Sequence, residues 1–406
     1  MHARMRLGWV MALAAIAVAA TTTHAQTPTD SKVVPAVVAP LMGDPMPAGS
    51  GVVPASGCSS CGLASPSQMS PGIYGYGKYP GPSCGAGGCG SEGCGENGCV
   101  PGRPPCETCE GQCRITRMFC ATHNALCCPD PCYEPRWNCV ANAALFVDGA
   151  QPVTQSRLRW DSGQNVTSPD RSEFFWAAIG GKGRPKPESS VNYNELSFYQ
   201  EVATEKFSFY IMQPYRNMNA AVNGGSGGFG DLTLGTKTLF LDSEVIHQSF
   251  QFQTQIPTGN PGNGSGVGHV SLTPSILTSV KLYPDTFLQS QLGYWIPIAG
   301  SVVNGSSYAG GVFQFNQSVN HVICRPLRDT ALIGSIESVG YVFTSGKFTD
   351  PTGTVFSANN QTYFSIGPGF RLCICEKADI GFGAQFSVTN NHFADQLYRT
   401  EVRWRF

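Results

Sequence analysis

The sequence predicts an all-β protein, a transmembrane antiparallel β-barrel of about 12 strands preceded by a Cys- and Gly-rich region of low order. Three observations predict this fold class. The 406 residues include 48 glycines and 29 prolines, which interrupt long helices and favour frequent turns. Beyond the N-terminus, no run of eighteen uninterrupted apolar residues could cross a membrane as a helix. From about residue 171, apolar and polar residues alternate over segments of nine to fourteen residues, which is the period of a strand.

Residues 1–25 are predicted to be a secretory signal peptide. Arg4 and Arg6 precede the apolar run 7–20, and residues 23–25 (THA) offer small side chains at a cleavage site. An N-terminal membrane anchor is the alternative, but the apolar run is shorter than the roughly 20 residues that span a bilayer. We therefore expect export through the inner membrane, followed by a flexible linker over residues 26–57 that is rich in Thr, Pro, Ala, Val and Gly.

Residues 58–139 form a Cys-rich region that we expect to lie in the periplasm. An exported segment with many cysteines and few large apolar residues favours disulfides in place of a large core. Metal binding is the alternative, because two CxxC pairs are followed by Cys113 and His123. We assign no metal, cofactor or cysteine pairing. Fourteen of the 17 cysteines lie here: Cys58, Cys61, Cys84, Cys89, Cys94, Cys99, Cys106, Cys109, Cys113, Cys120, Cys127, Cys128, Cys132 and Cys139.

Residues 140–170 are expected to form a plug or an extra strand. The apolar stretch Ala143 to Val147 could enter the lumen of the barrel. The three remaining cysteines, Cys324, Cys373 and Cys375, lie near expected short turns. One disulfide among these three and free thiols are both compatible with the sequence.

The outer-membrane barrel is expected over residues 171–406. Its connections alternate between short turns and longer loops rich in Gly, Asn and Ser, and this alternation with an even strand number is typical of bacterial outer-membrane barrels. The short turns and both ends of the barrel should then be periplasmic. The twelve expected strands are 171–180, 195–203, 206–216, 230–241, 245–256, 269–282, 286–298, 311–323, 330–343, 361–374, 378–389 and 397–406.

The last segment carries an expected insertion signal. Its apolar row, which ends on the terminal aromatic residue, resembles the C-terminal targeting signal of outer-membrane proteins and implies recognition by the barrel-assembly machinery. The alternate row is charged and should face a watery interior. The row assigned to the signal is Tyr398, Val402, Trp404 and Phe406.

Strand alternation also selects candidate lumen residues. Each could bias which solutes pass, and the alternative for each is a structural place in an internal hydrogen-bond network. Segment 330–343 is ambiguous, because Ile333 and Val339 share a face with Glu337. The candidates are Glu195, Glu201, Lys237, His247, Gln251, Gln253, Arg371, Arg399, Glu401, Arg403 and Arg405.

Two motifs resemble a known family. Residues 230–237 (GDLTLGTK) and 255–259 (QIPTG) resemble the "GDLxLGxK... PTG" pattern of outer-membrane β-barrel transporters associated with phenol-degradation pathways. Residues 169–176 (PDRSEFFW) and the Cys- and Gly-rich preface are similar to planctomycete members. The resemblance covers roughly residues 165–406 and implies passage of small aromatic or hydrophobic molecules. It supplies no substrate residues, and the Cys-rich region departs from the simpler family pattern.

The predicted function is an outer-membrane channel or transporter for small solutes, including hydrophobic or aromatic compounds. Lys and Arg number 26 against 27 Asp and Glu, so the basic excess that nucleic-acid binding needs is absent. Expected partners are outer-membrane lipid, the barrel-assembly machinery and a small-molecule solute. The alternative is a structural envelope protein, in which the barrel is an anchor and the Cys-rich region binds or cross-links a periplasmic partner.

An outer-membrane phospholipase is a further hypothesis, because His247 and Ser249 share one face of a strand. That face should point into the lumen, whereas such lipases act at the lipid face. The neighbouring segments also offer little beyond Asp231 to orient the imidazole. We therefore predict that the protein is not an enzyme.

Overall fold

The computed structural model describes Cys120 and residues 137–168, 182–303, 305–327 and 329–406. The chain divides into two units, Met1–Gln68 and Met69–Phe406, and every described residue belongs to the second. The expected signal peptide and linker, most of the Cys-rich region and the expected strand 171–180 lie outside the described residues.

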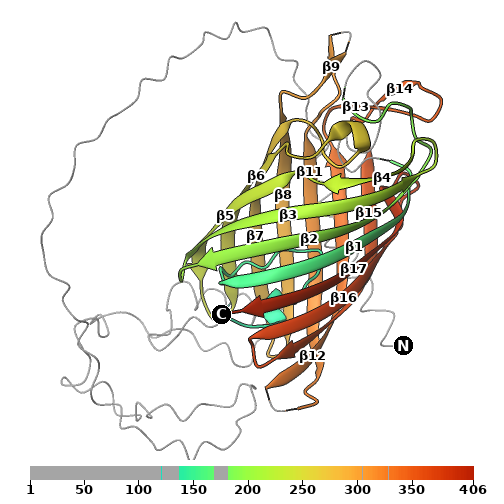
Figure 1. Ribbon diagram of the computed structural model, residues 1–406. Helices are drawn as coiled ribbons and strands as arrows, with labels where there is room; N and C mark the ends of the chain where they lie inside the picture. The colour runs from blue at the N-terminus through green and yellow to red at the C-terminus, as the bar shows by residue number, and fades with distance from the viewer. Residues whose placement is uncertain (1–119, 121–136, 169–181, 304, 328) are drawn as a thin grey trace, which may run out of the picture. The chain divides into compact units, whose positions relative to one another are not determined.

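Twelve antiparallel strands close into a barrel (Figure 1), which confirms the predicted fold class. Each strand pairs with its neighbours in the chain, and the barrel closes because β1 pairs with both β17 and β2. The barrel strands are β1 (Gln155–Val166), β2 (Val191–Ala203), β3 (Phe207–Ala220), β5 (Leu232–Asp242), β6 (Ile246–Ile256), β7 (Val270–Tyr283), β8 (Thr286–Ile298), β11 (Val312–Cys324), β12 (Thr330–Phe343), β15 (Thr362–Ile374), β16 (Ala378–Ser387) and β17 (Ala394–Arg405).

The start of the barrel differs from the sequence-based expectation. The barrel begins at Gln155 in β1 rather than at residue 171, so part of the region expected to be a plug or extra strand is the first strand of the wall. In β1, Leu158 and Trp160 point outward while Arg157 and Asp161 are buried inside. The other eleven expected strands correspond to β2, β3, β5 to β8, β11, β12 and β15 to β17.

The two ends of the barrel are built differently. Residues 204–206, 243–245, 284–285 and 375–377 connect strands at one end, where the connection between β11 and β12, Gln155 and Arg405 also lie. We call this the short-turn end, which is periplasmic in bacterial barrels. The opposite, long-loop end carries six short elements: β4 (Gly224–Phe229), η3 (Pro261–Asn263), β9 (Val302–Val303), β10 (Ser306–Ser307), β13 (Lys347–Thr349) and β14 (Val355–Ser357).

Along each strand, successive side chains alternate between the outer and the inner face of the wall. Apolar side chains that point outward are exposed, as shown by Phe198 (53%), Phe370 (51%) and Trp404 (59%). Their neighbours along each strand are polar and buried inside the barrel. This pattern places the apolar row against hydrocarbon and keeps polar groups off the lipid face. Separately, none of the described helices has the length and apolar content to span a bilayer.

The row assigned to the insertion signal lies on the outer face of β17 and just after it. Val402, Trp404 and Phe406 are exposed, while Tyr398 is partly buried and stacks on Phe382 with ring centroids 6.5 Å apart. The geometry is that of a lipid-facing row, and recognition by the barrel-assembly machinery stays a prediction.

A charge on the outer face should destabilise the barrel. Leu292 is 45% exposed at the centre of β8, so we expect Leu292→Arg to lower the free energy of unfolding by about 2–4 kcal/mol. The measurement is denaturant unfolding of the full chain refolded into lipid vesicles. Val355→Arg, on β14 at the long-loop end, is the matched control and should change stability little. An equal loss in both variants would contradict the assignment of the lipid face.

Candidate functional site

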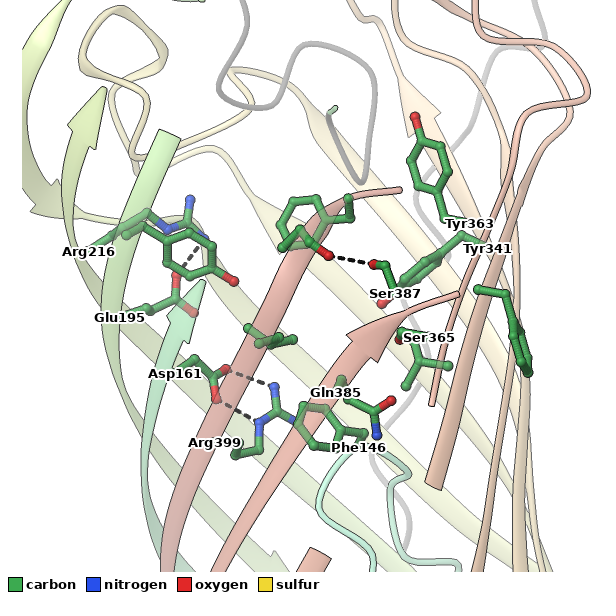
Figure 2. A pocket seen from close by; sticks show the side chains of 16 residues that line it. Phe146, Asp161, Glu195, Arg216, Tyr341, Tyr363, Ser365, Gln385, Ser387 and Arg399 are labelled. Atoms are coloured by element: carbon green, nitrogen blue, oxygen red, sulfur yellow. Dashed lines mark hydrogen bonds and ion pairs between the residues drawn. The ribbon is translucent and has the colours of Figure 1, made fainter. Parts of the chain in front are cut away.

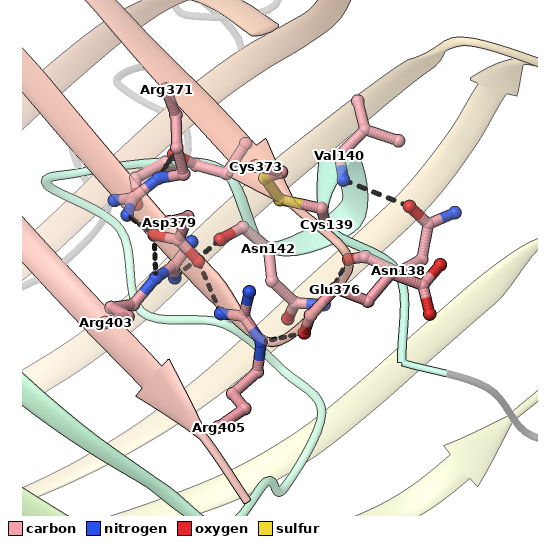
Figure 3. The surroundings of a disulfide bond; sticks show 12 residues. Asn138, Cys139, Val140, Asn142, Arg371, Cys373, Glu376, Asp379, Arg403 and Arg405 are labelled. Carbon is pink, nitrogen blue, oxygen red and sulfur yellow. Dashed lines mark hydrogen bonds and ion pairs between the residues drawn. A yellow bond between two sulfur atoms is a disulfide. The ribbon is translucent and has the colours of Figure 1, made fainter. Parts of the chain in front are cut away.

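A segment preceding β1 occupies the barrel interior. This lumen loop, residues 137–153, includes the short helix η2 (Val140–Asn142), which lies among the strands in Figure 3. The loop starts at the short-turn end, where the Arg405 guanidinium lies 3.7 Å from the Trp137 ring. It reaches deeper at Leu145, beside Glu337 in the middle of β12, and returns to β1 at the same end.

Apolar residues on the inner wall receive the lumen loop. Cys139, Val140, Ala141 and Ala143 form a buried cluster with inner-wall side chains, and Leu145 and Phe146 form a second one. The ambiguity of segment 330–343 is explained by these contacts, because its inward apolar residues pack on the loop. The inner-wall members of the two clusters are Phe287, Val322, Ile333, Val339 and Cys373.

Three glycines leave the space that Leu145 fills. A Cβ on Gly383 would lie 2.6 Å from Leu145 Cδ1, and one on Gly369 or Gly381 would lie 3.0 Å from the same side chain. The wall of β15 and β16 is therefore shaped to accept the loop.

Buried polar groups on the wall bind the backbone of the lumen loop. The Glu337 carboxylate accepts hydrogen bonds from the N–H groups of Leu145 at 2.9 Å and Phe146 at 2.8 Å. Arginine side chains donate to loop carbonyls: Arg371 to Ala143 at 2.8 Å, Arg399 to Leu145 at 2.7 Å and Arg403 to Asn142 at 2.8 Å. An unpaired buried backbone group costs about 1–3 kcal/mol. These side chains remove that cost for the loop backbone and so stabilise the loop inside the lumen.

A disulfide ties the lumen loop to the wall (Figure 3). It joins Cys139 on the loop to Cys373 on β15. Of the two possibilities that the sequence left open for Cys324, Cys373 and Cys375, a disulfide among these three does not form, and Cys324 and Cys375 carry exposed free thiols. Cys139, Cys373 and Asp379 lie close enough to form a metal-ligand set, but the two sulfurs are joined to each other and are not thiolate ligands.

The charges of the lumen form compact buried clusters. Asp379 pairs with Arg371, Arg405 and, at 2.8 Å, Arg403. Glu401 pairs with Arg371 at 2.9 Å. Removing one partner from such a cluster would leave an uncompensated buried charge, which costs more than the pair contributes.

Every candidate lumen residue lies on the inner side of the wall, in one of several environments. Glu201 and Lys237 are paired at 3.4 Å, and Gln251 donates to Asp148 of the lumen loop at 3.1 Å. Arg399 forms two hydrogen bonds of 2.7 Å to Asp161. The other candidates on the inner side are Glu195, His247, Gln253, Arg371, Glu401, Arg403 and Arg405.

The geometry around His247 does not assemble a nucleophile and base. His247 Nδ1 lies 2.7 Å from the Asp242 carboxylate, which is not the Asp231 considered from the sequence. The Ser249 hydroxyl donates to the carbonyl of Ala150 in the lumen loop. Both side chains are thus engaged in structural contacts inside the barrel, and Asp231 lies elsewhere.

Asp231 instead supports the family-like motif at the long-loop end. Its carboxylate accepts hydrogen bonds from the backbone N–H groups of Gly259 at 3.0 Å and Val267 at 2.8 Å. The Thr258 hydroxyl donates to the carbonyl of Gly230 at 3.0 Å. The motif therefore fixes the loop between β6 and β7, and it contributes no group to the lumen chemistry described above.

Several inner-wall residues were not selected from the sequence. Arg157, Arg159 and Asp161 belong to β1, whose region was expected to be a plug or an extra strand. Tyr193 on β2 and Arg216 on β3 are not among the candidates either. Alternation of Leu158 and Trp160 with these charged residues is the signal that would have found β1.

The charge environment of Asp148 is set by the inner wall. Asp148 belongs to the lumen loop and not to a strand. Burial alone would raise the pKa of its carboxyl, but the charges of Arg157, Arg159 and Lys237 and the Gln251 amide outweigh burial and hold the pKa below its ordinary value. Asp148 is therefore ionised at neutral pH and holds the deep part of the loop against β1 and β6.

Within the described part of the chain, two cavities adjoin the lumen loop. The outer cavity, about 210 Å³, lies toward the long-loop end and is lined by aromatic and charged residues such as Tyr341, Tyr363 and Arg216 (Figure 2). The inner cavity, about 180 Å³, includes Arg157 and Asn316 in its lining. Phe146 and Arg399 line both cavities, and the Arg399 guanidinium lies 4.5 Å from the Phe146 ring centre. We call this pair, which lines both cavities, the partition.

A closed antiparallel wall with an apolar exterior and a charged, hydrogen-bonded interior defines a transmembrane β-barrel protein. The match of residues 188–399 to the family described as "Putative MetA-pathway of phenol degradation" covers more than half of the chain. The protein belongs to this family, as its motifs suggested.

Comparisons with solved structures give likenesses to outer-membrane proteins. An outer membrane channel from Pseudomonas putida F1 is 11% identical, with 65% of this chain and 97% of that chain covered and a TM-score of 0.41. The NanC porin is 8% identical over 62% of this chain and 100% of that chain, with a TM-score of 0.38. For the KdgM porin the values are 9%, 62%, 99% and 0.32. A comparison with curated protein sequences gave no match.

Removal of the Glu337 carboxylate should loosen the deep part of the lumen loop. Glu337→Ala leaves the N–H groups of Leu145 and Phe146 without their acceptor, at about 1–3 kcal/mol each. We expect hydrogen exchange at these two amides to accelerate by about tenfold or more. Exchange is measured on the folded full chain in detergent.

Glu244→Ala is the matched control for that measurement. Glu244 lies in an exposed turn at the short-turn end, where it pairs with Lys281 at 3.5 Å. Its loss should leave exchange at Leu145 and Phe146 unchanged. Unchanged exchange in Glu337→Ala as well would mean that the carboxylate does not hold the loop.

Proposed function

We propose that the protein is an outer-membrane channel that admits small solutes, hydrophobic or aromatic compounds among them. The observation that supports this proposal is a pair of consecutive cavities inside a closed, polar-lined barrel, separated by the partition of Phe146 and Arg399. A purely anchoring barrel needs no such spaces.

The dimensions of the cavities favour small solutes. A cavity of about 150 Å³ is large enough to hold benzene. The outer and inner cavities, about 210 and 180 Å³, are each suited to a single ring of that size. Aromatic side chains lining both cavities offer flat surfaces, and the charged side chains would discriminate by charge and hydrogen bonding.

The lumen loop narrows the path through the barrel in the described structure. It packs on inner-wall side chains near the short-turn end, while the loop between β6 and β7 packs Val267 against inner residues of β1, β2 and β3 at the other end. Passage from one cavity to the other therefore needs a movement of Phe146 or Arg399. We place the protein in the outer membrane, inserted after export by the barrel-assembly machinery.

The anchoring alternative depends on the Cys-rich region, nearly all of which lies outside the described residues. A periplasmic partner for that region, and disulfide pairing within it, stay predictions.

Truncation of the partition should widen the path. We expect Phe146→Ala to join the two cavities and to raise the unitary conductance above that of the native protein in a planar bilayer, because the ring fills the space between them. Phe229→Ala, whose ring is 64% exposed, is the matched control and should conduct like the native protein. A correctly folded Phe146→Ala variant with unchanged conductance would refute the partition as the narrowest point. No conductance from any folded variant would refute the channel.

A further inference from the structure

One arginine on the inner wall lacks a hydrogen-bonded acceptor. Arg157 is 93% buried, yet in the described part of the chain its guanidinium makes only long ion pairs, 3.7 Å to Asp148 and 3.5 Å to Glu401. Its Nε has no hydrogen-bond partner. The arginines that surround it, by contrast, donate to carboxylates at hydrogen-bond distance, as Arg399 does to Asp161 and Arg403 to Asp379.

The carboxylate nearest to Arg157 is shared. Glu401 also pairs with Arg159 at 3.0 Å, Arg371 at 2.9 Å and Arg403 at 3.8 Å. One negative charge therefore serves four guanidinium groups, and the Arg157 guanidinium meets it only at 3.5 Å. A buried cation in this position favours an anion that brings its own acceptor atoms.

The opposite wall of the same cavity holds a second unsatisfied group. Asn316 on β11 is 94% buried, and its Oδ1 has no hydrogen-bond partner. Both Asn316 and Arg157 line the inner cavity, and they belong to strands that are far apart in the strand order of the barrel. A molecule that bridges them needs acceptor atoms at one end and a hydrogen-bonding group at the other.

The space between these two groups has aromatic sides. Tyr199 and Tyr210 line the inner cavity with ring centroids 5.0 Å apart, and Phe146 closes it toward the outer cavity. The Arg157 guanidinium lies 4.4 Å from the centre of the Tyr199 ring, which holds it in place by a cation–π contact. A flat ring fits the volume and stacks on these faces.

We propose that the inner cavity is a binding site for a small monocyclic carboxylate that carries a second polar substituent, with its carboxylate on Arg157 and its substituent on Asn316. The site deepens the proposed channel function and rests on it, because a binding site inside the lumen selects a solute only if the lumen conducts. A bidentate contact between the Arg157 guanidinium and a carboxylate would satisfy the unpaired Nε.

Direct titration calorimetry on the full chain folded in detergent tests the site without requiring passage. The probes are 4-hydroxybenzoate, benzoate, which lacks the hydroxyl, and 4-hydroxybenzyl alcohol, which lacks the carboxylate. We expect 4-hydroxybenzoate to bind most tightly and the alcohol to bind at least about tenfold more weakly, because a hydrogen bond to a charged group contributes more than a neutral one. Absence of binding by the native protein, or equal binding of the alcohol, would overturn the site.

Two variants report on the two ends of the ligand. Arg157→Gln should weaken 4-hydroxybenzoate binding by about tenfold to a hundredfold and leave the alcohol nearly unaffected. Asn316→Ala should lower the affinity for 4-hydroxybenzoate to that for benzoate. Heat-modifiable gel mobility shows whether each variant folds. If Arg157→Gln does not fold, Asn316→Ala still tests the site. Unchanged affinities in folded variants would overturn the assignment of the two contacts.

The matched control is Arg325→Gln. Arg325 pairs with Asp285 at 2.6 Å on the exposed short-turn end, so this variant removes the same charge outside the lumen and should bind like the native protein. Equal weakening in the control would mean that overall charge, and not the inner cavity, governs binding. Flux of an uncharged solute into liposomes that contain the protein separates the two proposals. Binding without flux would refute the channel function, and flux without binding would refute the binding site.

Discussion

The hydrogen-bonding requirement of the backbone in hydrocarbon governs the rest of this structure. Lipid offers no partner to an N–H or C=O group, so each strand must pair on both sides, and β1 meets this requirement by pairing with β17 and with β2. Closure then assigns every second side chain to the interior. The inner faces of the twelve strands carry many polar and charged side chains. Charges removed from water destabilise the fold unless they have partners nearby.

The lumen loop and the charged wall satisfy that need together. Wall side chains such as Glu337 and Arg371 find backbone groups of the loop, and the loop covers inward apolar residues such as Ile333 and Val339. Other buried charges of the wall pair with one another, as Asp379 does with Arg371 and Arg403. Arg157 and Asn316, each with one side-chain atom that lacks a hydrogen-bond partner, line the space that the loop leaves open. The spaces inside this barrel are therefore defined as much by the loop as by the wall.

Parity made most of the wall predictable from the sequence. Eleven strands and the inward side of each candidate lumen residue follow from period-two alternation, which lipid on one face and water on the other impose locally. The first strand was predicted only as one of two alternatives, a plug or an extra strand, because β1 has only two large outward apolar residues, Leu158 and Trp160, before the polar run 161–165. Long-range pairing left no local signal: Cys139 and Cys373 are 234 residues apart, and Arg157 gains its significance only from Asn316 across the lumen.

The final strand, β17, carries two rows of side chains that serve different purposes on its two faces. Its outer row, with Val402 and Trp404, faces the bilayer. Its inner row, with Arg399 and Arg403, donates hydrogen bonds to carbonyl groups of the lumen loop. Neither row touches the surroundings of the other, so each is open to change without disturbing its neighbour. Outer-row substitutions can adjust the strand to membranes of different thickness, and inner-row substitutions can retune how firmly the loop is seated, at adjacent positions of the same twelve residues.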